Sequence, residues 1–548
     1  MESTRIFLFI ALVTVSYFLW NAWETDHQIR QPVTSVLTTP SIPGEVKPLA
    51  ASTIKEPATE AAARFITVQT DLLDVVINTQ GGDIVKTSLR KYPNTLKSSE
   101  PYVLLNNDPN SIYLAQSGLV SQAGPDNQQT AAVYQADQAH YQLSDDQKEL
   151  TVKLKWRNNE GLAIVKTYTF KRDSYVIDVG YQVNNHSNQV WTGQFYTQLK
   201  RLNLPEHKQM FQFSTFTGAS ISSPEKPYEK IAYKKLSEHD LNRQVKGGWL
   251  AFQQHYFLSA WIPNPEQVST YYSHANGDIY TLGAISSVLT AAPQEKLQTS
   301  AKIYIGPEVA DYLKTVAPNL DLTIDYGWLW IISSFLFWLM KHIYNVIGNW
   351  GWAIVMVTLL IKLVFYKLSA TSYRSMARMR ELQPKIETLK EMYGDDRQKM
   401  SQEMMKLYRE QKVNPFGGCL PILVQIPFFI ALYYVLIESV ELRQAPFVLW
   451  IHDLASADPY YVLPILMGIS MLVQQRLSPA PPDPIQAKVM MALPIVFTFL
   501  FLNFPAGLVL YWVVNNSLSI LQQWYITRRL KLAPPVIHKT VKGKTKRK

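Results

Sequence analysis

One lysine, Lys362, lies inside an apolar run from Trp350 to Tyr366 that is long enough to enter a membrane. A fixed cation at the centre of a membrane helix costs about 2.5–3.5 kcal/mol on the insertion scale. About 18 Å of helix separates Lys362 from Trp350, which places the ammonium past the middle of a hydrocarbon core about 30 Å thick. Snorkelling along the side chain would reduce this cost without removing it. We therefore expect Lys362 to face water, a partner charge or a substrate.

Polar side chains accompany this lysine in the apolar segments. Thr358 lies one helical turn before it, and Gln425 lies in the next apolar segment. The last apolar segment carries a polar stripe at helical spacing, made of Trp512, Asn515, Asn516, Ser519, Gln522 and Gln523. Such amides often do no more than bond membrane helices to one another. A buried cation together with a stripe that reaches the helix end favours a water-filled cavity.

No carboxylate is available inside the membrane to pair with Lys362, because no Asp or Glu occurs in the predicted spans after the first. A transporter that relays protons usually carries such carboxylates. An unpaired cation in a wet cavity would instead attract carboxylates brought by another molecule, such as a peptide.

Motifs for enzymatic chemistry are missing from the sequence. The ten histidines form no H-E-x-x-H zinc motif, and no G-x-S-x-G elbow occurs. Gly543-Lys544-Thr545 resembles the end of a phosphate loop, but His538 stands where that motif needs a glycine. The single cysteine, Cys419, excludes an intrachain disulfide and a C-x-x-C motif. We expect no catalytic residue, no metal site and no cofactor.

The apolar segments and the composition between them divide the chain into anchored and soluble parts. The first apolar stretch is predicted to be an uncleaved anchor, because Trp20 occupies the position where cleavage before Trp23 would need a small residue. In chain order we expect an N-terminal anchor (1–23), a linker (24–63), a soluble domain (64–320), an amphipathic interfacial helix (321–348), TM2 (349–372), a helical hairpin (373–412), TM3 (413–437), a loop (438–458), TM4 (459–475), a loop (476–488), TM5 (489–504), TM6 (505–526) and a basic tail (527–548).

Charge counts orient these spans. The segment 367–412 holds eleven Lys or Arg against seven acids, and the tail 527–548 holds nine Lys or Arg and no acid. The positive-inside rule therefore places both segments and both termini in the cytoplasm, and the soluble domain outside. Tyr326–Ile347 is apolar enough to span the membrane, but a span there would invert everything that follows. We prefer a helix that lies on the outer interface.

The soluble domain reads as an antiparallel β-sandwich. Short alternating stretches such as Phe65–Thr70, Ala163–Phe170 and Tyr175–Val183 recur with few helical patterns between them. Good helix formers on either side of Gly394 predict the projecting hairpin, and its methionines at helical spacing are predicted to form the hairpin core.

Four motifs resemble those of the YidC membrane protein insertases of Gram-negative bacteria. They are Asn414–Cys419, Val440–Phe447, Leu449–Leu454 and Phe504–Tyr511. The resemblance covers essentially the whole chain. It implies a galactose-mutarotase-like periplasmic sandwich and five core helices around a hydrophilic groove that is open to the cytoplasm and to lipid.

The resemblance also assigns roles to residues. The family's groove cation falls on Lys362, where members generally carry arginine, so a bidentate grip on a carboxylate is in doubt. The implied polar lining is Thr358, Gln425, Asn515, Asn516 and Ser519. The implied slide for substrate helices is Phe429, Met467, Phe501 and Trp512. The tail residues expected to meet the ribosome by electrostatic attraction to its RNA are Arg528, Arg529, Lys531, Lys544, Lys546, Arg547 and Lys548.

The resulting hypothesis is an insertase and chaperone of the bacterial inner membrane that hydrolyses nothing itself. Its expected partners are nascent membrane proteins, the ribosome, the Sec translocon and membrane lipids. A solute transporter or channel is the alternative, although the spans show neither paired carboxylates nor inverted repeats. A periplasmic carbohydrate-active enzyme on an anchor is a second alternative, for which no acid–base pair can be chosen from the sequence.

Overall fold

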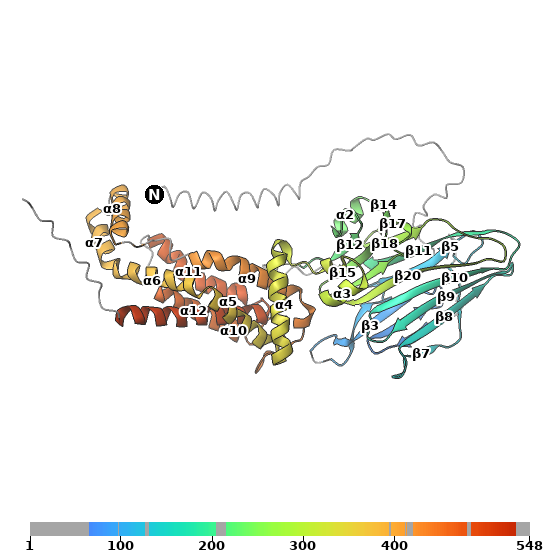
Figure 1. The fold of residues 1–548 in the computed structure, drawn as a ribbon, viewed down its shortest axis with the longest axis horizontal. Coiled ribbons are helices and arrows are strands. Elements are labelled where there is room, and N and C mark those ends of the chain that lie inside the picture. The colour runs from blue at the N-terminus through green and yellow to red at the C-terminus, as the bar shows by residue number, and fades with distance from the viewer. Residues whose placement is uncertain are drawn as a thin grey trace, which may run out of the picture.

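The computed structural model describes residues 65–532 except 97, 127–130, 204–214, 394–395, 412, 414–419 and 479–483. The expected anchor (1–23) and linker (24–63) lie outside the described residues, as does the tail beyond residue 532. Figure 1 shows two parts, a β-sandwich formed by the first half of the chain and a helical bundle formed by the second half.

Two sheets form the sandwich within the described residues. The first, named here the β11 sheet, has the order β14-β17-β18-β11-β5-β3-β2-β1-β7, with β4 and β19 paired at its side. Its strands are β1 (Phe65–Gln69), β2 (Leu73–Asn78), β3 (Ile84–Pro93), β4 (Pro101–Leu105), β5 (Tyr113–Val120), β7 (His140–Gln142), β11 (Trp191–Leu202), β14 (Asn242–Lys246), β17 (Val268–Asn276), β18 (Ile279–Ser286) and β19 (Leu289–Ala291).

The second sheet, named here the β20 sheet, has the order β13-β12-β15-β16-β20-β10-β9-β8-β6. Its strands are β6 (Gln135–Ala136), β8 (Glu149–Arg157), β9 (Leu162–Lys171), β10 (Val176–Asn185), β12 (Gly218–Ser222), β13 (Glu229–Ile231), β15 (Trp249–Gln254), β16 (Phe257–Ile262) and β20 (Lys296–Pro307). A short helix, α2 (Tyr233–Glu238), lies between β13 and β14 in the chain.

Side chains alternate between buried and exposed along these strands, so each strand turns one face toward the core. In β9 every second side chain from Leu162 to Phe170 is buried, and in β10 the same holds from Ile177 to Asn185. Period-two alternation is the property by which the sequence predicted the strands. The predicted all-β sandwich followed by a helical membrane region is confirmed.

One charged cluster lies inside the sandwich core. Lys166, fully buried on β9, donates hydrogen bonds to the backbone oxygens of Gly81 (3.1 Å) and Ser117 (2.8 Å). Burial lowers the pKa of Lys166 to about 8 and raises the pKa of Asp126 to about 6. Because these groups are satisfied by backbone partners, we assign the cluster to holding the two sheets together.

A helical connection leads from the sandwich to the bundle. It consists of α3 (Ala310–Val316), the 3-10 turns η1 (Leu320–Thr323) and η2 (Gly327–Leu329), and α4 (Trp330–Ile347). Figure 1 shows α4 lying across the ends of the bundle helices, between them and the sandwich. Lys341 on α4 pairs with Asp311 on α3 at 2.6 Å, and Lys230 pairs with Asp325, which ties the connection to the sandwich.

The bundle contains α5 (Trp350–Val364), α6 (Tyr366–Glu381), α9 (Leu420–Glu438), α10 (Val462–Leu477), α11 (Pro484–Phe501) and α12 (Ala506–Leu532), with the turn η4 (Val440–Leu442) after α9. The segment predicted as TM2 (349–372) is not one straight helix in the structure. The chain bends by 68° between α5 and α6, at Phe365. The last helix also continues to Leu532, past the predicted boundary at residue 526.

Within the segment predicted as a hairpin (373–412), residues up to Glu381 continue α6, and α7 (Gln383–Tyr393) and α8 (Arg397–Glu410) project from the end of the bundle opposite the sandwich (Figure 1). Leu382, between α6 and α7, and Tyr408 on α8 are buried in one small cluster. Ile386 on α7 and Met404 on α8 pack against this cluster. The methionine pattern on the hairpin therefore reflects, in part, its own core.

Helix length and hydropathy give a partial view of the spans. In the described part of the chain, Gly327–Ile347 alone is long and apolar enough to cross a membrane as one helix, and the bent pair α5 and α6 passes the same test together. Shorter apolar helices occupy Val424–Glu438, Val462–Leu477 and Lys488–Phe501. The α4 segment is the one that the sequence assigned to the interface rather than to a span.

A direct contact joins the bundle to the sandwich. The guanidinium of Arg443, just after η4, lies 5.4 Å from the ring centre of Tyr102 and 5.6 Å from that of Phe257. The same guanidinium donates hydrogen bonds to the carbonyl oxygens of Pro93 (2.8 Å) and Asn94 (3.2 Å). The planar cation fits this role, since it stacks on rings and donates in several directions.

Candidate functional site

Lys362 lies in the last turn of α5, directly before the bend. Its ammonium donates hydrogen bonds to the hydroxyl of Ser519 on α12 (2.7 Å) and to the side-chain oxygen of Gln425 on α9 (3.3 Å). The orphan carbonyls at a helix C-terminus favour a cation there. The side chain is only 7% exposed, so in this arrangement it is enclosed by three helices rather than open to a wide cavity.

The partners of Lys362 are neutral. No carboxylate of the described residues lies within ion-pairing distance of its ammonium. Ser519 in turn donates to the backbone oxygen of Asn515 (2.7 Å), so its hydroxyl accepts from the lysine and donates within α12. The cation therefore has hydrogen-bond partners but no counter-charge.

Thr358 is buried one turn before Lys362 but does not contact it. Its hydroxyl donates a hydrogen bond to the backbone oxygen of Ile354 at 2.7 Å. Buried threonine hydroxyls in helices often bond in this way to the backbone four residues earlier. Thr358 therefore packs beside the lysine but does not bond to it, and the hydrogen-bond partners of the ammonium are Ser519 and Gln425.

The predicted polar stripe of α12 is divided between two sides of the helix. Ser519 faces α5, and Gln522 donates to the backbone oxygen of Tyr366 on α6 (3.2 Å). Asn516 instead donates to the hydroxyl of Ser470 on α10 (3.1 Å), and Gln523 donates to the backbone oxygen of Leu477 (2.8 Å). Two of the six stripe residues, Asn516 and Gln523, thus bind α10 to α12, which is the ordinary role of amides between membrane helices.

Two polar residues on α10 were missed from the sequence. The side chain of Gln474 donates to the side-chain oxygen of Gln523 at 2.7 Å, and Ser470 accepts from Asn516. Ser470 and Gln474 are four residues apart and so share one face of α10. That spacing was available as a signal in the sequence.

An aromatic cluster lies beside the lysine's helices. Phe429 on α9 meets Trp512 on α12 edge to face at 4.7 Å and stacks on Tyr511 at 6.0 Å. Phe501 on α11 packs against Trp512 at 5.3 Å. The structure therefore brings three of the four predicted slide residues together, from three helices.

Exposure separates these predicted slide residues. Phe429 and Trp512 are partly exposed, whereas Phe501 is 4% exposed and Met467 is 0% exposed. Met467 lies on α10 in the interior of the bundle and is not presented to a substrate in this arrangement. A sliding surface made by Phe429 and Trp512 is compatible with their positions, whereas Met467 and Phe501 would have to be uncovered first.

The predicted tail contacts are only partly described. Arg528 and Arg529 lie on the exposed end of α12, where each guanidinium covers an aromatic ring one turn earlier, Trp524 at 5.4 Å and Tyr525 at 4.7 Å. The backbone of Lys531 is helical. Lys544, Lys546, Arg547 and Lys548 lie outside the described residues, as does the motif Asn414–Cys419.

No metal centre emerges from the described side chains. Within them no group of three His, Cys, Asp or Glu residues is placed to hold a metal ion. Around Lys362 the described side chains offer a cation, neutral hydrogen-bond partners and nearby aromatic rings.

Two family models together match nearly all of the described residues. The model described as the YidC periplasmic domain matches residues 65–339, and the model described as the 60Kd inner membrane protein matches residues 342–533. The protein named "Membrane protein insertase YidC" of Legionella pneumophila (strain Paris) is 51% identical over 541 residues, which cover 96% of this chain and 97% of the relative.

Solved structures give more distant matches. A YidC insertase crystal structure with its first transmembrane domain resolved matches with a TM-score of 0.38 and 17% identity, covering 85% of this chain and 95% of that one. A galactose mutarotase related enzyme from Lactobacillus acidophilus matches with a TM-score of 0.30 and 9% identity, covering 44% of this chain and 97% of that one. By the two family models and the close curated relative, this chain belongs to the YidC family of membrane protein insertases.

Proposed function

We propose that the protein inserts nascent membrane proteins into the inner membrane by drawing an acidic segment of the substrate to Lys362. The observation that carries this proposal is a buried cation whose described partners, Ser519 and Gln425, are neutral. Desolvating a charge without a counter-charge is costly, so an incoming carboxylate would lower the free energy of the site. The Lys362 ammonium would therefore attract a substrate carboxylate before any substrate has bound.

The exchange of partners would proceed through single hydrogen bonds. Ser519 and Gln425 each accept one bond from the ammonium, and a lysine has three donors. A substrate carboxylate would take the remaining donor or replace Gln425, whose bond is the longer of the two at 3.3 Å. Because lysine is a point charge rather than a planar fork, the grip on one carboxylate is monodentate.

The apolar part of the substrate would leave along the aromatic cluster of Phe429 and Trp512. Both side chains are partly exposed and lie next to each other on α9 and α12, the helices that also carry Gln425 and Ser519. A substrate helix held there would be close to both the cation and the lipid. Its transfer into lipid would supply the driving force, at roughly 25 cal/mol per Å² of apolar surface.

Charge and the position of α4 support one orientation of the protein in the membrane. The hairpin α7–α8 and the basic end of α12 would lie in the cytoplasm by the positive-inside rule, with the sandwich in the periplasm. The exposed apolar side chains of α4, among them Trp330, Phe335 and Trp338, would then rest in the outer interface. In this orientation Arg528 and Arg529 would face the ribosome, and the Sec translocon would be a lateral partner.

Site-specific crosslinking tests this arrangement directly. A photoreactive residue at position 429 or 512 is expected to crosslink to a ribosome-bound nascent membrane protein as its first apolar segment emerges. Ile469, an exposed residue of α10, serves as the control position on a different helix. Equal crosslinking from all three positions would contradict a defined path for the substrate.

A further inference from the structure

One face of helix α6 lies on the last turns of α12. Ala370 and Tyr373 on α6 are buried in one small cluster with Ile526 on α12, and Met376 packs against this cluster. Side chains three residues apart, such as Ala370 and Tyr373, share one face of a helix. The apolar contact therefore fixes where α6 rests on α12.

The hydroxyl of Tyr373 extends from this apolar cluster to a polar group of α12. It is hydrogen-bonded to the hydroxyl of Ser519, which lies about two turns before Ile526 on the same side of the helix. Tyr373 is only 7% exposed, and a buried tyrosine hydroxyl usually has such a partner. Ser519 also accepts the hydrogen bond of Lys362 at 2.7 Å. Tyr373 and Lys362 therefore bond to the same hydroxyl.

These partners use the full hydrogen-bonding capacity of the Ser519 hydroxyl. A serine hydroxyl offers one donor and two acceptor positions. Its donor goes to the backbone oxygen of Asn515 at 2.7 Å, and one acceptor position takes the ammonium of Lys362. Tyr373 must then donate to the second acceptor position. With three partners the hydroxyl is held in one orientation, with one acceptor position directed at the lysine.

The position of Lys362 depends on this hydroxyl. The other described partner of the ammonium is the side-chain oxygen of Gln425, and that bond is longer, at 3.3 Å. Lysine carries a compact charge at the end of a flexible four-carbon stem, so it does not orient itself as a planar guanidinium does. A group that fixes the Ser519 hydroxyl therefore also fixes the ammonium.

A second bond attaches the start of α6 to the same part of α12. Gln522, one turn after Ser519, donates to the backbone oxygen of Tyr366 at 3.2 Å, and Tyr366 is the first residue of α6. Tyr366 and Tyr373 are about two turns apart. The first half of α6 is thus held to α12 at two places, and of these the Tyr373 contact is the one made to the Ser519 hydroxyl.

We propose that Tyr373 is a positioning residue for the groove cation: through Ser519 it holds Lys362 in the orientation that receives a substrate carboxylate. This inference deepens the proposed function and rests on it for the substrate step, whereas the fixed position of Lys362 does not depend on it. A tyrosine with a purely structural role would act through its ring, by packing α6 on α12. A positioning tyrosine acts through its hydroxyl, so Tyr373→Phe separates the two roles.

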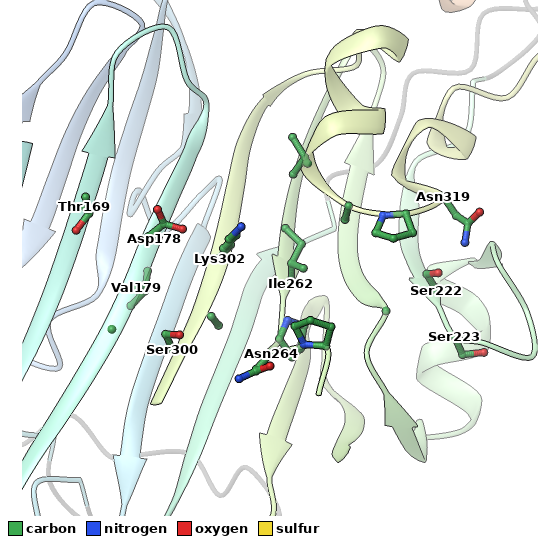
Figure 2. Close-up of a pocket in the computed structure, with 18 of the residues that line it drawn as sticks. Thr169, Asp178, Val179, Ser222, Ser223, Ile262, Asn264, Ser300, Lys302 and Asn319 are labelled. Carbon is green, nitrogen blue, oxygen red and sulfur yellow. The ribbon is translucent and has the colours of Figure 1, made fainter. Parts of the chain in front are cut away.

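The first test measures how firmly Lys362 is held in the full-length protein in nanodiscs. Mass spectrometry follows the rate at which a small, water-soluble, amine-reactive ester labels each lysine. In Tyr373→Phe we expect Lys362 to be labelled about threefold faster, on the scale of one net hydrogen bond. Lys302 is the internal reference, since it is an exposed lysine on β20 that lines a cavity of about 660 Å³ in the sandwich (Figure 2).

The second test measures insertion into vesicles as a function of substrate concentration. Tyr373→Phe should raise the half-saturating concentration of a substrate with an acidic tail about threefold and leave its maximal rate unchanged, because binding to the cation is weakened. Insertion of a substrate with a neutral tail should not change. Tyr408→Phe, at an equally buried tyrosine of the hairpin core, is the matched control and should behave as the wild type. An equal loss for both tails would show that Tyr373 acts by packing alone and would overturn the proposal.

A double mutant shows whether Tyr373 acts through Ser519. Tyr373→Phe added to Ser519→Ala should not speed the labelling of Lys362 further, because both changes break the same chain of bonds. Additive increases would overturn the inference. Unchanged labelling in Tyr373→Phe, while insertion of the acidic tail still depends on Lys362, would reject this inference alone. Faster labelling in Tyr373→Phe, with insertion that does not depend on Lys362, would reject the proposed function and still support the positioning of the lysine by Tyr373.

Discussion

The ammonium of Lys362 donates a hydrogen bond of 2.7 Å to the hydroxyl of Ser519, and both side chains are buried where α5 meets α12. A neutral hydroxyl orients the charge without neutralising it. The pair therefore holds a cation in a fixed place, ready for a counter-charge that the described residues do not provide. This relationship makes Ser519 a positioning residue for the lysine.

Replacing Ser519 with Ala should free the lysine from α12. We expect a loss of stability of roughly 1–3 kcal/mol, because a buried charged donor is left without one of its partners. Insertion of a substrate with an acidic tail should slow, while insertion of a substrate with a neutral tail should not. Thermal unfolding in detergent and a reconstituted insertion assay measure the two effects.

Ser517→Ala is the matched control for that variant. Ser517 lies on the same helix, is exposed, and donates only to the backbone oxygen of Val513. A defect in Ser517→Ala as large as that of Ser519→Ala would show that helix propensity, not the bond to Lys362, is responsible.

The amide pair Gln474 and Gln523 should hold α10 to α12. The side chains are bonded at 2.7 Å, and Gln523 also reaches the end of α10 through Leu477. A double-mutant cycle with Leu at both positions should give a coupling of about 0.6–1.7 kcal/mol, the range found for polar pairs between membrane helices. Gln522→Leu, which loses a contact with α6 instead, should show no coupling with Gln474→Leu.

Arg443 should fasten the sandwich to the bundle. Arg443→Gln removes both ring contacts and the bonds to Pro93 and Asn94, so we expect faster amide hydrogen exchange in β4 and in the turn before it. Arg443→Lys keeps the charge but not the planar fork, and an intermediate effect is expected. Exchange that does not change in Arg443→Gln would show that the two parts are held together by other contacts.

Glu308 should make the stability of the sandwich depend on pH. Burial is the main cause that raises the pKa of Glu308 to about 8, against an ordinary value of 4.5. The folded state therefore holds this proton more tightly than the unfolded state between these two values, so the stability from this group falls as the pH rises from about 4.5 to 8. Each unit by which the pKa of Glu308 is higher in the folded than in the unfolded state corresponds to about 1.4 kcal/mol of unfolding free energy lost across this pH range.

Glu308→Gln isolates that contribution. The amide can keep the contact with Gln253, whose side chain now donates to the carboxyl at 3.1 Å. The melting temperature of the wild-type protein should fall more steeply between pH 5 and pH 8 than that of the variant. Parallel curves for the two proteins would mean that Glu308 does not carry the protonation change.

The sandwich was predictable from the sequence because its signal is local. Alternation along β9 and β10 appears residue by residue, and nothing in the tertiary structure overrides it. Lys166 is the exception, since a lysine at an inward position breaks the apolar pattern. Its burial is explained by its hydrogen bonds to the backbone oxygens of Gly81 and Ser117. The sequence pattern alone contains no information on which distant backbone groups will meet such a side chain.

The helical site was predictable only in part. Lys362 stands out in the sequence because a charge in an apolar run is costly, and the structure bonds it to Gln425 and Ser519, two of the polar residues that the sequence singled out. The bend at Phe365 has no Pro or Gly beside it to signal it in the sequence, and the packing of α6 against α12 that accompanies it is a tertiary contact. The division of the α12 stripe also depended on where α10 lies, which periodicity along one helix does not reveal.

Charge reversal at position 362 is the most direct measurement of the central claim. Lys362→Glu should block insertion of a substrate with an acidic tail, restore some insertion when that tail is made basic, and leave the protein folded, while Lys362→Arg should insert both substrates as the wild type does. Vesicle insertion with protease protection of the translocated tail gives the readout. Normal insertion of the acidic-tailed substrate by a folded Lys362→Glu protein would contradict the account.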